Sequence, residues 1–192
     1  MVAVIKYNAG NIKSLSFALE RIGVDFKVTG EPEEILKADK VIFPGVGEAG
    51  STMKYLKEFK LDAVIKSLTQ PMLGICLGMQ LMCKHSEENS TACLGIFDDT
   101  VKRIPTLNNL KVPHMGWNKL LKQNDWLANT DEDYAYFVHS YYVPANEFTS
   151  AVCNYGIEIS AAMRKNNFYA LQFHPEKSAE AGSKILQTFL SL

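Results

Sequence analysis

A cysteine between two glycines is the first feature of this chain whose residue types and spacing could do chemistry. Gly74-Ile75-Cys76-Leu77-Gly78 joins an apolar stretch to a helical pattern, as a nucleophile elbow does, with cysteine in place of serine. Both glycines are needed there because side chains at these positions would collide with neighbouring backbone. A helix N-terminus also favours the thiolate, the reactive form of cysteine. The pentapeptide therefore predicts Cys76 as a nucleophile.

A histidine followed by a carboxylate could supply the matching base. Ala170 to Phe173 reads as a strand that runs into His174, Pro175 and Glu176. A histidine at a strand end can reach the rim of the elbow, and the carboxylate can fix its tautomer and stabilise the imidazolium. Each residue alone also fits a structural role, as a buried cysteine, a surface histidine or a glutamate that begins a helix. The combination predicts a triad in the order Cys76, His174, Glu176.

A zinc site is the competing interpretation of histidine, glutamate and cysteine together. The zinc deaminase signature continues with P-C-x-x-C, which this chain lacks, and His85, His114 and His139 lie on separate predicted segments without ligand spacing. No metal is expected. The remaining thiols show no C-x-x-C and no disulfide-like spacing, so we expect Cys83, Cys93 and Cys153 to be small apolar residues in a reducing compartment.

The elements that must position these residues alternate between strand and helix in the first half. Val2 to Tyr7, Phe26 to Thr29, Lys40 to Phe43 and Met72 to Ile75 read as strands, separated by helical patterns. This rhythm predicts a parallel sheet with helices on both faces.

Closely spaced strand candidates follow in the second half, at Val101 to Ile104, Tyr134 to Val138, Ala151 to Asn154, Ile159 to Met163 and Tyr169 to Phe173. They predict added antiparallel strands, and Ser178 to Leu190 predicts a closing helix with Ser178 as its cap. The fold class is α/β, with a mostly parallel central sheet in a single domain over 1–192.

Bulk composition narrows the partners. The chain has 192 residues, 47% hydrophobic, with a formal net charge of -1, which leaves no electrostatic footprint for nucleic acid or an anionic membrane. The apolar start, Met1 to Tyr7, is too short for a signal segment or a membrane span. We expect a cytoplasmic protein whose ligands are small molecules or other proteins.

Longer motifs resemble the class I (triad) glutamine amidotransferases. The family's Gly-x-Cys-x-Gly-x-Gln elbow matches Gly74 to Gln80, and its distal His-Pro-Glu matches His174 to Glu176. Pro44-Gly45-Val46-Gly47, Pro113 to Asn118 and His139-Ser140-Tyr141 resemble further family segments in the expected order, so the resemblance covers the whole chain. It implies a flavodoxin-like α/β fold and hydrolysis of L-glutamine through a cysteine thioester, without a cofactor.

The resemblance also implies a set of site residues beyond the triad. The substrate-binding residues would be Gly45, Val46, Gly47, Leu77, Gln80, Glu88, His139, Ser140 and Tyr141. Backbone N–H groups of the Pro44 to Gly47 loop and of Leu77 would form the oxyanion hole. Since Gly45 and Gly47 permit a peptide flip, we expect the hole to be incomplete in the free chain.

Within the family, the chain most resembles the glutaminase subunits of imidazole glycerol phosphate synthases, through Pro44 to Gly47 and His114 to Asn118. The usual Asp-Tyr-Gly reads Lys6-Tyr7-Asn8 here, a departure in a loop expected near the partner. The implied partner is the cyclase subunit, in a heterodimer, with Asn11, Trp117 and Lys177 as interface candidates.

Three alternatives remain open at this point. One is a glutaminase that serves another synthase, such as one that aminates a sugar precursor. The second is a cysteine peptidase or an esterase-like hydrolase on the same elbow. The third is a binding subunit without activity, which an intact Cys76, His174 and Glu176 set disfavours.

Overall fold

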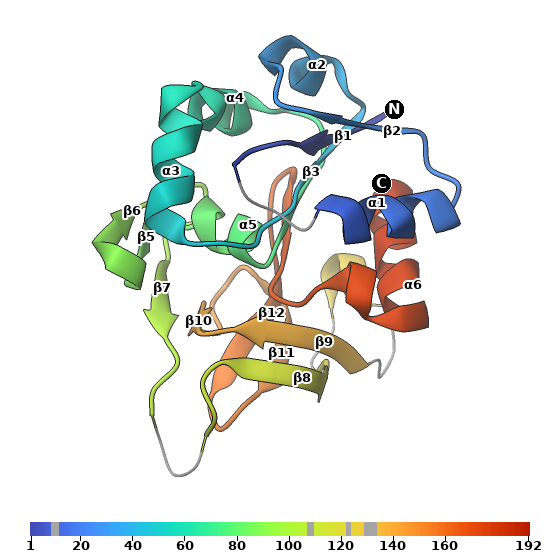
Figure 1. Ribbon diagram of the computed structural model, residues 1–192. Helices are drawn as coiled ribbons and strands as arrows, with labels where there is room; N and C mark the ends of the chain where they lie inside the picture. Colours follow the sequence, from blue (N-terminus) through green and yellow to red (C-terminus); the bar gives the residue numbers. More distant parts are fainter. Residues whose placement is uncertain (9–11, 107–109, 122–123, 129–133) are drawn as a thin grey trace.

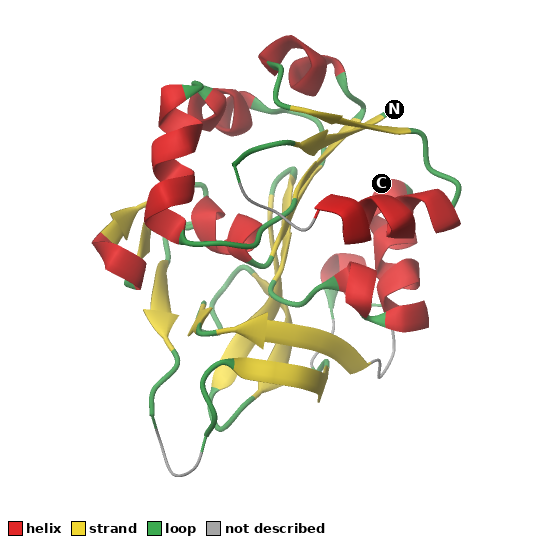
Figure 2. Cartoon of the chain, viewed as in Figure 1, coloured by secondary structure: helices red, strands yellow, loops and turns green. Residues whose placement is uncertain are grey.

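A seven-stranded sheet forms the centre of the molecule (Figures 1 and 2), in a computed structural model that describes residues 1–8, 12–106, 110–121, 124–128 and 134–192. Its strands are β1 (Val2–Ile5), β2 (Phe26–Thr29), β3 (Lys40–Phe43), β4 (Met72–Ile75), β11 (Thr149–Asn154), β12 (Glu158–Lys165) and β13 (Phe168–Leu171). The order across the sheet is β11-β12-β13-β4-β3-β1-β2. The strands from β13 to β2 are parallel, and β12 and β11 extend that edge in antiparallel fashion. The predicted mostly parallel sheet with antiparallel additions is confirmed.

The parallel strands β1, β4 and β13 are buried along their whole length because helices cover both faces of the sheet. The edge strand β2 is half-exposed and carries Lys27. In β1, Ala3 and Ile5 enter one buried cluster, whereas Val2 and Val4 enter the cluster on the opposite face. This alternation is the period-two geometry of a strand. In the parallel pairing of β1 with β3, Val4 lies opposite Ile42.

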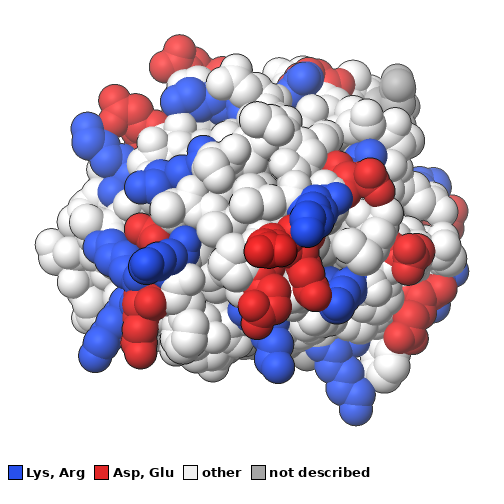
Figure 3. Space-filling view, turned by 90° about the horizontal axis from the view of Figure 1, so that it is seen from above, with Lys and Arg blue, Asp and Glu red and all other residues white. Residues whose placement is uncertain are grey.

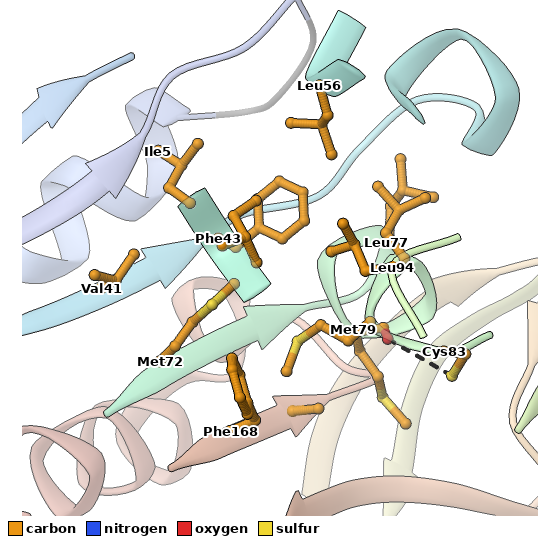
Figure 4. Packing of buried hydrophobic residues seen from close by; sticks show 14 of the residues in the cluster. Ile5, Val41, Phe43, Leu56, Met72, Leu77, Met79, Cys83, Leu94 and Phe168 are labelled. Atoms are coloured by element: carbon orange, nitrogen blue, oxygen red, sulfur yellow. Dashed lines mark hydrogen bonds between the residues drawn. The ribbon is translucent and has the colours of Figure 1, made fainter. Parts of the chain in front are cut away.

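Six α-helices lie within the described residues: α1 (Ile12–Arg21), α2 (Pro32–Lys37), α3 (Ala49–Glu58), α4 (Leu61–Ser67), α5 (Leu77–Met82) and α6 (Ala179–Leu190). Helices α2 to α5 share the first cluster, where Phe43 and Met72 meet Leu56 and Leu77 (Figure 4). Helices α1 and α6 share the second cluster, through Leu15, Leu19, Ile185 and Phe189 among others.

Two smaller sheets lie beside the central one. The first contains β5 (His85–Ser86), β6 (Thr91–Ala92), β7 (Thr100–Arg103) and β10 (Tyr141–Tyr142), and the second pairs β8 (His114–Lys119) with β9 (Tyr134–His139). Figure 1 shows β9 running beside β8, away from the helices α2 to α4. Ala135 and Phe137 of β9 reach into the second cluster. The pair is therefore fixed to the α6 side of the sheet.

The predicted cap of the closing helix is wrong. Ser178 precedes α6, but its side chain makes no capping hydrogen bond and its backbone (φ -101°, ψ 28°) is not extended, as a capping residue requires. Its hydroxyl instead donates to the carbonyl of His174 (2.7 Å) and accepts the N–H of Tyr136 (2.9 Å). The short 3-10 turn Pro175–Lys177 turns this side chain inward. Ser178 therefore connects β9 to the segment that carries His174.

Charged side chains of both signs are interspersed on the face shown in Figure 3, where no large area carries a single sign. Among the described helices, none is long and apolar enough to span a membrane.

Candidate active site

Cys76 lies at the turn between β4 and α5, in a conformation that few L-residues adopt. Its φ is 51° and its ψ is -107°, a strained geometry found at nucleophile elbows. The strain is compatible with folding because the backbone is held tightly, with the Cys76 N–H donating to Leu171 O at 2.7 Å. The predicted elbow is thus present in the structure.

The glycines around the elbow are sterically required. A Cβ on Gly78 would overlap the carbonyl oxygen of Phe43, and one on Gly74 would lie 2.9 Å from backbone atoms of Gly78 and Met79. Gly45 in the preceding loop lies against the elbow in the same way, since its Cβ would overlap Gly78 N. These contacts press the loop 44–47 directly onto the start of α5.

His174 reaches Cys76 because β13 and β4 are parallel neighbours and both residues follow the carboxyl ends of their strands. Its backbone is fixed on two sides, since its N–H donates to Tyr136 O (2.9 Å) and its carbonyl accepts the Ser178 hydroxyl. Its Nδ1 lies 2.8 Å from Glu176 Oε1, and both side chains are buried. The structure thus brings the three predicted triad residues together.

The charge balance around His174 favours its protonated form. Burial acts to lower the pKa of His174, but hydrogen bonds with Cys76 and Glu176, together with their negative charges, outweigh it and raise the pKa to about 10. Because the Nδ1–H of His174 donates to Glu176, Nε2 is the nitrogen left for the cysteine, and it has no other hydrogen-bond partner among the described residues. An imidazolium directed at a cysteine is the charge that a reactive thiolate requires beside it.

A pocket of about 320 Å³ opens over the elbow. It is lined by Val46, Gly47, Cys76, Leu77, Gln80, Glu88, Pro113, Val138, His139, Ser140, Tyr141 and His174. Every predicted substrate-binding residue except Gly45 is present. Gly45 lies outside this lining, packed against Gly78, and its role in substrate binding stays a prediction. Pro113 and Val138 were not among the predicted site residues, although Pro113 begins the family-like segment Pro113 to Asn118 and Val138 directly precedes His139.

Two of the predicted oxyanion-hole donors, the N–H groups of Val46 and Leu77, make hydrogen bonds within the protein. The N–H of Val46 donates to the Tyr7 hydroxyl (3.3 Å), which itself donates to Pro44 O (2.8 Å). The N–H of Leu77 donates to Gly45 O at 3.4 Å. Burial raises the pKa of Tyr7 far above its usual value, so the phenol stays protonated and can donate. Tyr7 was not among the predicted site residues.

Two glutamine side chains connect the pocket wall to the nucleophile. Gln80 Nε2 donates to Tyr141 O (2.8 Å) and to Gln172 Oε1 (3.1 Å), while Gln172 Nε2 donates to Cys76 Sγ at 3.8 Å. Gln172 is fully buried and was also missed, although an amide at the end of an otherwise apolar strand beside His174 is a usable signal. Glu88 is oriented by the N–H of Ala49 (2.8 Å), and burial raises its pKa.

The interface candidates lie away from the pocket lining. Trp117 is 53% exposed, its ring 6.0 Å from that of Tyr136, and Lys177 Nζ lies 5.8 Å from the same Tyr136 ring. Met115 and Tyr134 are exposed on the same strand pair. We call Met115, Trp117, Tyr134 and Tyr136 the aromatic patch. Asn11 lies outside the described residues.

Two of the three histidines that the sequence analysis placed on separate segments, His114 and His139, are in contact. His114 Nδ1 lies 3.0 Å from His139 Nε2, because β8 and β9 pair with these two residues opposite each other. Within the part of the chain that the structure describes, no group of three or more His, Cys, Asp or Glu side chains is arranged to hold a metal ion.

Comparisons with known proteins agree with this geometry. Residues 3–191 match the family described as glutamine amidotransferase class-I. The chain is 59% identical over 194 residues to imidazole glycerol phosphate synthase subunit HisH of Bacteroides fragilis, covering 100% of this chain and 99% of that one. The protein of the same name from Bacteroides thetaiotaomicron is 57% identical with equal coverage.

Solved structures show the same fold at much lower identity. One described as a glutamine amidotransferase superposes with a TM-score of 0.77 at 18% identity, covering 99% of this chain and 97% of that one. PurLQS from Thermotoga maritima superposes with a TM-score of 0.75 at 16% identity and the same coverage.

Proposed function

The chain belongs to the class I glutamine amidotransferase family, and on that premise we propose that it is the glutaminase subunit of an imidazole glycerol phosphate synthase. It hydrolyses L-glutamine to glutamate and ammonia and supplies the ammonia to histidine biosynthesis. The observation that carries this proposal is the full-length identity of 57% to 59% with subunits of that name. The arrangement of Cys76, His174 and Glu176 supports the chemistry.

The first half-reaction forms a thioester. The Cys76 thiolate attacks the side-chain amide carbon of glutamine, a C–S bond forms, and the carbonyl oxygen becomes an oxyanion. His174, held as an imidazolium by Glu176, then donates its Nε2 proton to the leaving nitrogen. The C–N bond breaks, ammonia departs, and a glutamyl thioester remains on Cys76.

The second half-reaction releases glutamate. His174, now neutral, accepts a proton from water as the water oxygen attacks the thioester carbon. The C–S bond breaks, the electron pair returns to sulfur, and the site regains its thiolate and imidazolium. Glu176 keeps Nδ1 protonated throughout, so that Nε2 is the atom that exchanges protons.

Glutamine is held through groups on the pocket wall. Both amide hydrogens of Gln80 are already donated, so Oε1 is the atom that remains to accept a hydrogen bond from the substrate ammonium group. The carboxylate of Glu88 provides the opposite charge. The backbone of His139, Ser140 and Tyr141, on the other side of the pocket, meets the substrate carboxylate.

The oxyanion loop has to rearrange before the reaction is fast. With the N–H groups of Val46 and Leu77 engaged by Tyr7 and Gly45, the developing oxyanion lacks donors that each contribute about 3 kcal/mol. A partner that binds the rearranged loop better than this one selects the active state. This explains why ammonia would be released only when an acceptor is ready.

The proposed partner is the cyclase subunit, in a heterodimer. There the ammonia enters a ribonucleotide intermediate and gives imidazole glycerol phosphate together with an aminoimidazole carboxamide nucleotide. The aromatic patch and Lys177 offer apolar, partly exposed area beside the active-site segment, as an interface core requires. We propose a cytoplasmic location, which the four free cysteine thiols support.

The test is glutamate production from glutamine by wild type, Cys76→Ala and Cys93→Ala, alone and with the cyclase subunit and its nucleotide ligand. We expect activity that rises strongly with partner and ligand, is abolished in Cys76→Ala and survives in Cys93→Ala, a half-buried thiol outside the pocket. Glutaminase activity that ignores the cyclase would favour another synthase. Cleavage of peptides or esters without glutaminase activity would favour another hydrolase.

A further inference from the structure

A chain of hydrogen bonds between side chains runs from strand β8 to the wall of the pocket. Asn118 Nδ2 lies 3.3 Å from His114 Nε2, His114 Nδ1 lies 3.0 Å from His139 Nε2, and His139 Nδ1 lies 2.7 Å from Tyr141 O. Both imidazoles are buried, with His114 stacked between the rings of Phe137 and Tyr155. The chemistry described above uses neither imidazole.

The last acceptor fixes every proton in this chain. A backbone carbonyl can only accept, so His139 Nδ1 must carry hydrogen and donate to Tyr141 O. In a neutral ring Nε2 of His139 is then an acceptor, which forces His114 to donate from its own Nδ1. His114 Nε2 becomes an acceptor in turn, and the amide of Asn118 is a suitable donor to it. The geometry therefore defines one tautomer for each histidine.

Both rings stay neutral in this environment. Burial lowers the pKa of His114 to about 4, and burial is also the main cause that lowers the pKa of His139 to about 3. Two positive charges also disfavour a second proton on His139, namely that of His174 across the pocket and that of His114 when His114 is protonated. A second proton on either ring would place two donors against each other and break the chain.

The chain of hydrogen bonds ends at the carbonyl of Tyr141, which also contacts the substrate site. Tyr141 O also accepts a hydrogen from Gln80 Nε2, whose second hydrogen goes to Gln172, and Gln172 donates to Cys76. Because both neighbours of Gln80 are acceptors, its amide must keep nitrogen inward and oxygen toward the pocket. A displaced Tyr141 carbonyl would free the Gln80 amide to rotate and would present an N–H where the substrate ammonium group binds.

We propose that His114 is a positioning residue for glutamine binding, which acts through His139 to hold the Tyr141 carbonyl and thereby the orientation of the Gln80 amide. This role rests on the proposed glutaminase function. It gives the side chain of His139 a role in addition to the role proposed above for its backbone. It also connects β8, the strand that carries Trp117, to the substrate site.

The first test reads the tautomers directly and does not depend on activity. Long-range ¹H–¹⁵N spectra of the intact protein, labelled at histidine and recorded at about pH 7, should show two neutral rings of the Nδ1–H form. Their signals are assigned from the spectra of His114→Asn and His139→Asn. A ring of the Nε2–H form, or a charged ring, at either position would overturn the proposal even if the glutaminase assignment holds.

The second test separates binding from chemistry. Asparagine places an N–H close to the Nδ1 position of histidine, whereas leucine has a similar size and no donor. With the partner and its ligand present, His114→Leu should raise KM for glutamine about 10-fold with kcat nearly unchanged, and His114→Asn should stay close to wild type. His85→Asn, on β5 outside the pocket lining, is the control.

The outcomes separate this proposal from the proposed function. An unchanged KM in His114→Leu, or an equal loss of kcat in the leucine and asparagine variants, would leave the histidine pair with a structural role only. Absence of glutaminase activity in the wild type would instead count against the proposed function, while the tautomer measurement still decides the hydrogen-bond chain.

Discussion

At the scale of single residues, the site depends on the buried ion pair of Glu176 and His174 and on the neighbouring cysteine, Cys76. Glu176 and His174 are both about 95% or more buried and lie 2.8 Å apart. Such a buried pair is stable only when its geometry is good. The backbone of His174 is held by Tyr136 and Ser178, which fixes the ring direction that proton transfer to and from Nε2 requires.

Glu176→Gln should therefore lower glutaminase kcat by about 10² to 10⁴-fold, since a neutral amide no longer stabilises the imidazolium. The pKa of His174, about 10 in the wild type, should fall. The imidazolium acts as the acid, so activity is lost as pH rises through this pKa, and the alkaline limb of the kcat profile should move to lower pH in the variant. Glu180→Gln, an exposed change on α6, is the control.

A profile measured across pH with partner and ligand decides this. An alkaline limb that does not move in Glu176→Gln would mean that Glu176 does not set the protonation of His174.

At the scale of elements, the proposed activation centres on the loop 44–47 between β3 and α3. It is pressed onto the elbow by Gly45 and Gly78, and the hydroxyl of Tyr7, which follows β1, bridges Pro44 O and Val46 N. A single hydroxyl thus holds a peptide whose N–H would serve the oxyanion after a flip. This contact involves one hydroxyl, but we expect it to affect the reaction rate.

Tyr7→Phe should release the loop. Without partner, glutaminase activity should rise by about 5- to 10-fold, because losing hydrogen bonds worth about 1 kcal/mol shifts the population toward the hole-forming state. Stimulation by the cyclase subunit should shrink by a similar factor. Tyr55→Phe, on α3 away from the pocket lining, controls for loss of a hydroxyl.

Steady-state rates with and without partner measure this effect. Equal basal rates in wild type and Tyr7→Phe, with both proteins folded, would show that Tyr7 does not restrain the loop.

At the scale of the whole molecule, two buried clusters on opposite faces of one sheet hold the carboxyl ends of β4 and β13 in a fixed relation. The pair β8 and β9 is attached to the second face. Val138 and His139 of the pocket lining therefore belong to the same small sheet as the aromatic patch. The two buried histidines of this sheet also make the stability of the molecule depend on pH.

Unfolding free energy should fall as pH drops. His114 and His139 have folded pKa values lowered to about 4 and about 3, against about 6.5 when unfolded. A lowered folded pKa means that the unfolded chain binds more protons, so this stability is present above about pH 6.5 and is lost toward pH 4. Between about pH 7 and pH 5, each histidine should contribute a loss of about 2 kcal/mol.

Urea titrations of wild type and His114→Asn at the two pH values provide the measurement. The variant lacks one titrating ring and should lose about 2 kcal/mol less stability than the wild type over this interval, whereas an equal loss in both proteins would show that His114 is not buried in neutral form.

Residue patterns along the chain were enough to predict the fold class, the elbow and the composition of the triad. Apolar runs at strand spacing and helical periodicity are local properties, and Gly74, Cys76 and Gly78 lie within five consecutive residues. His174 and Glu176 are also close to each other in the chain. The resemblance to family segments then predicted most residues of the pocket lining.

Contacts between segments far apart in the chain became visible only in the three-dimensional structure. Tyr7 reaches Val46 because β1 and β3 are neighbours, and His114 meets His139 through the register of β8 and β9. Ser178 was predicted from its position before a helix, but its hydroxyl follows the stronger need of buried backbone groups for partners. Hydrogen bonds of this kind depend on strand order and register, which local residue patterns do not encode.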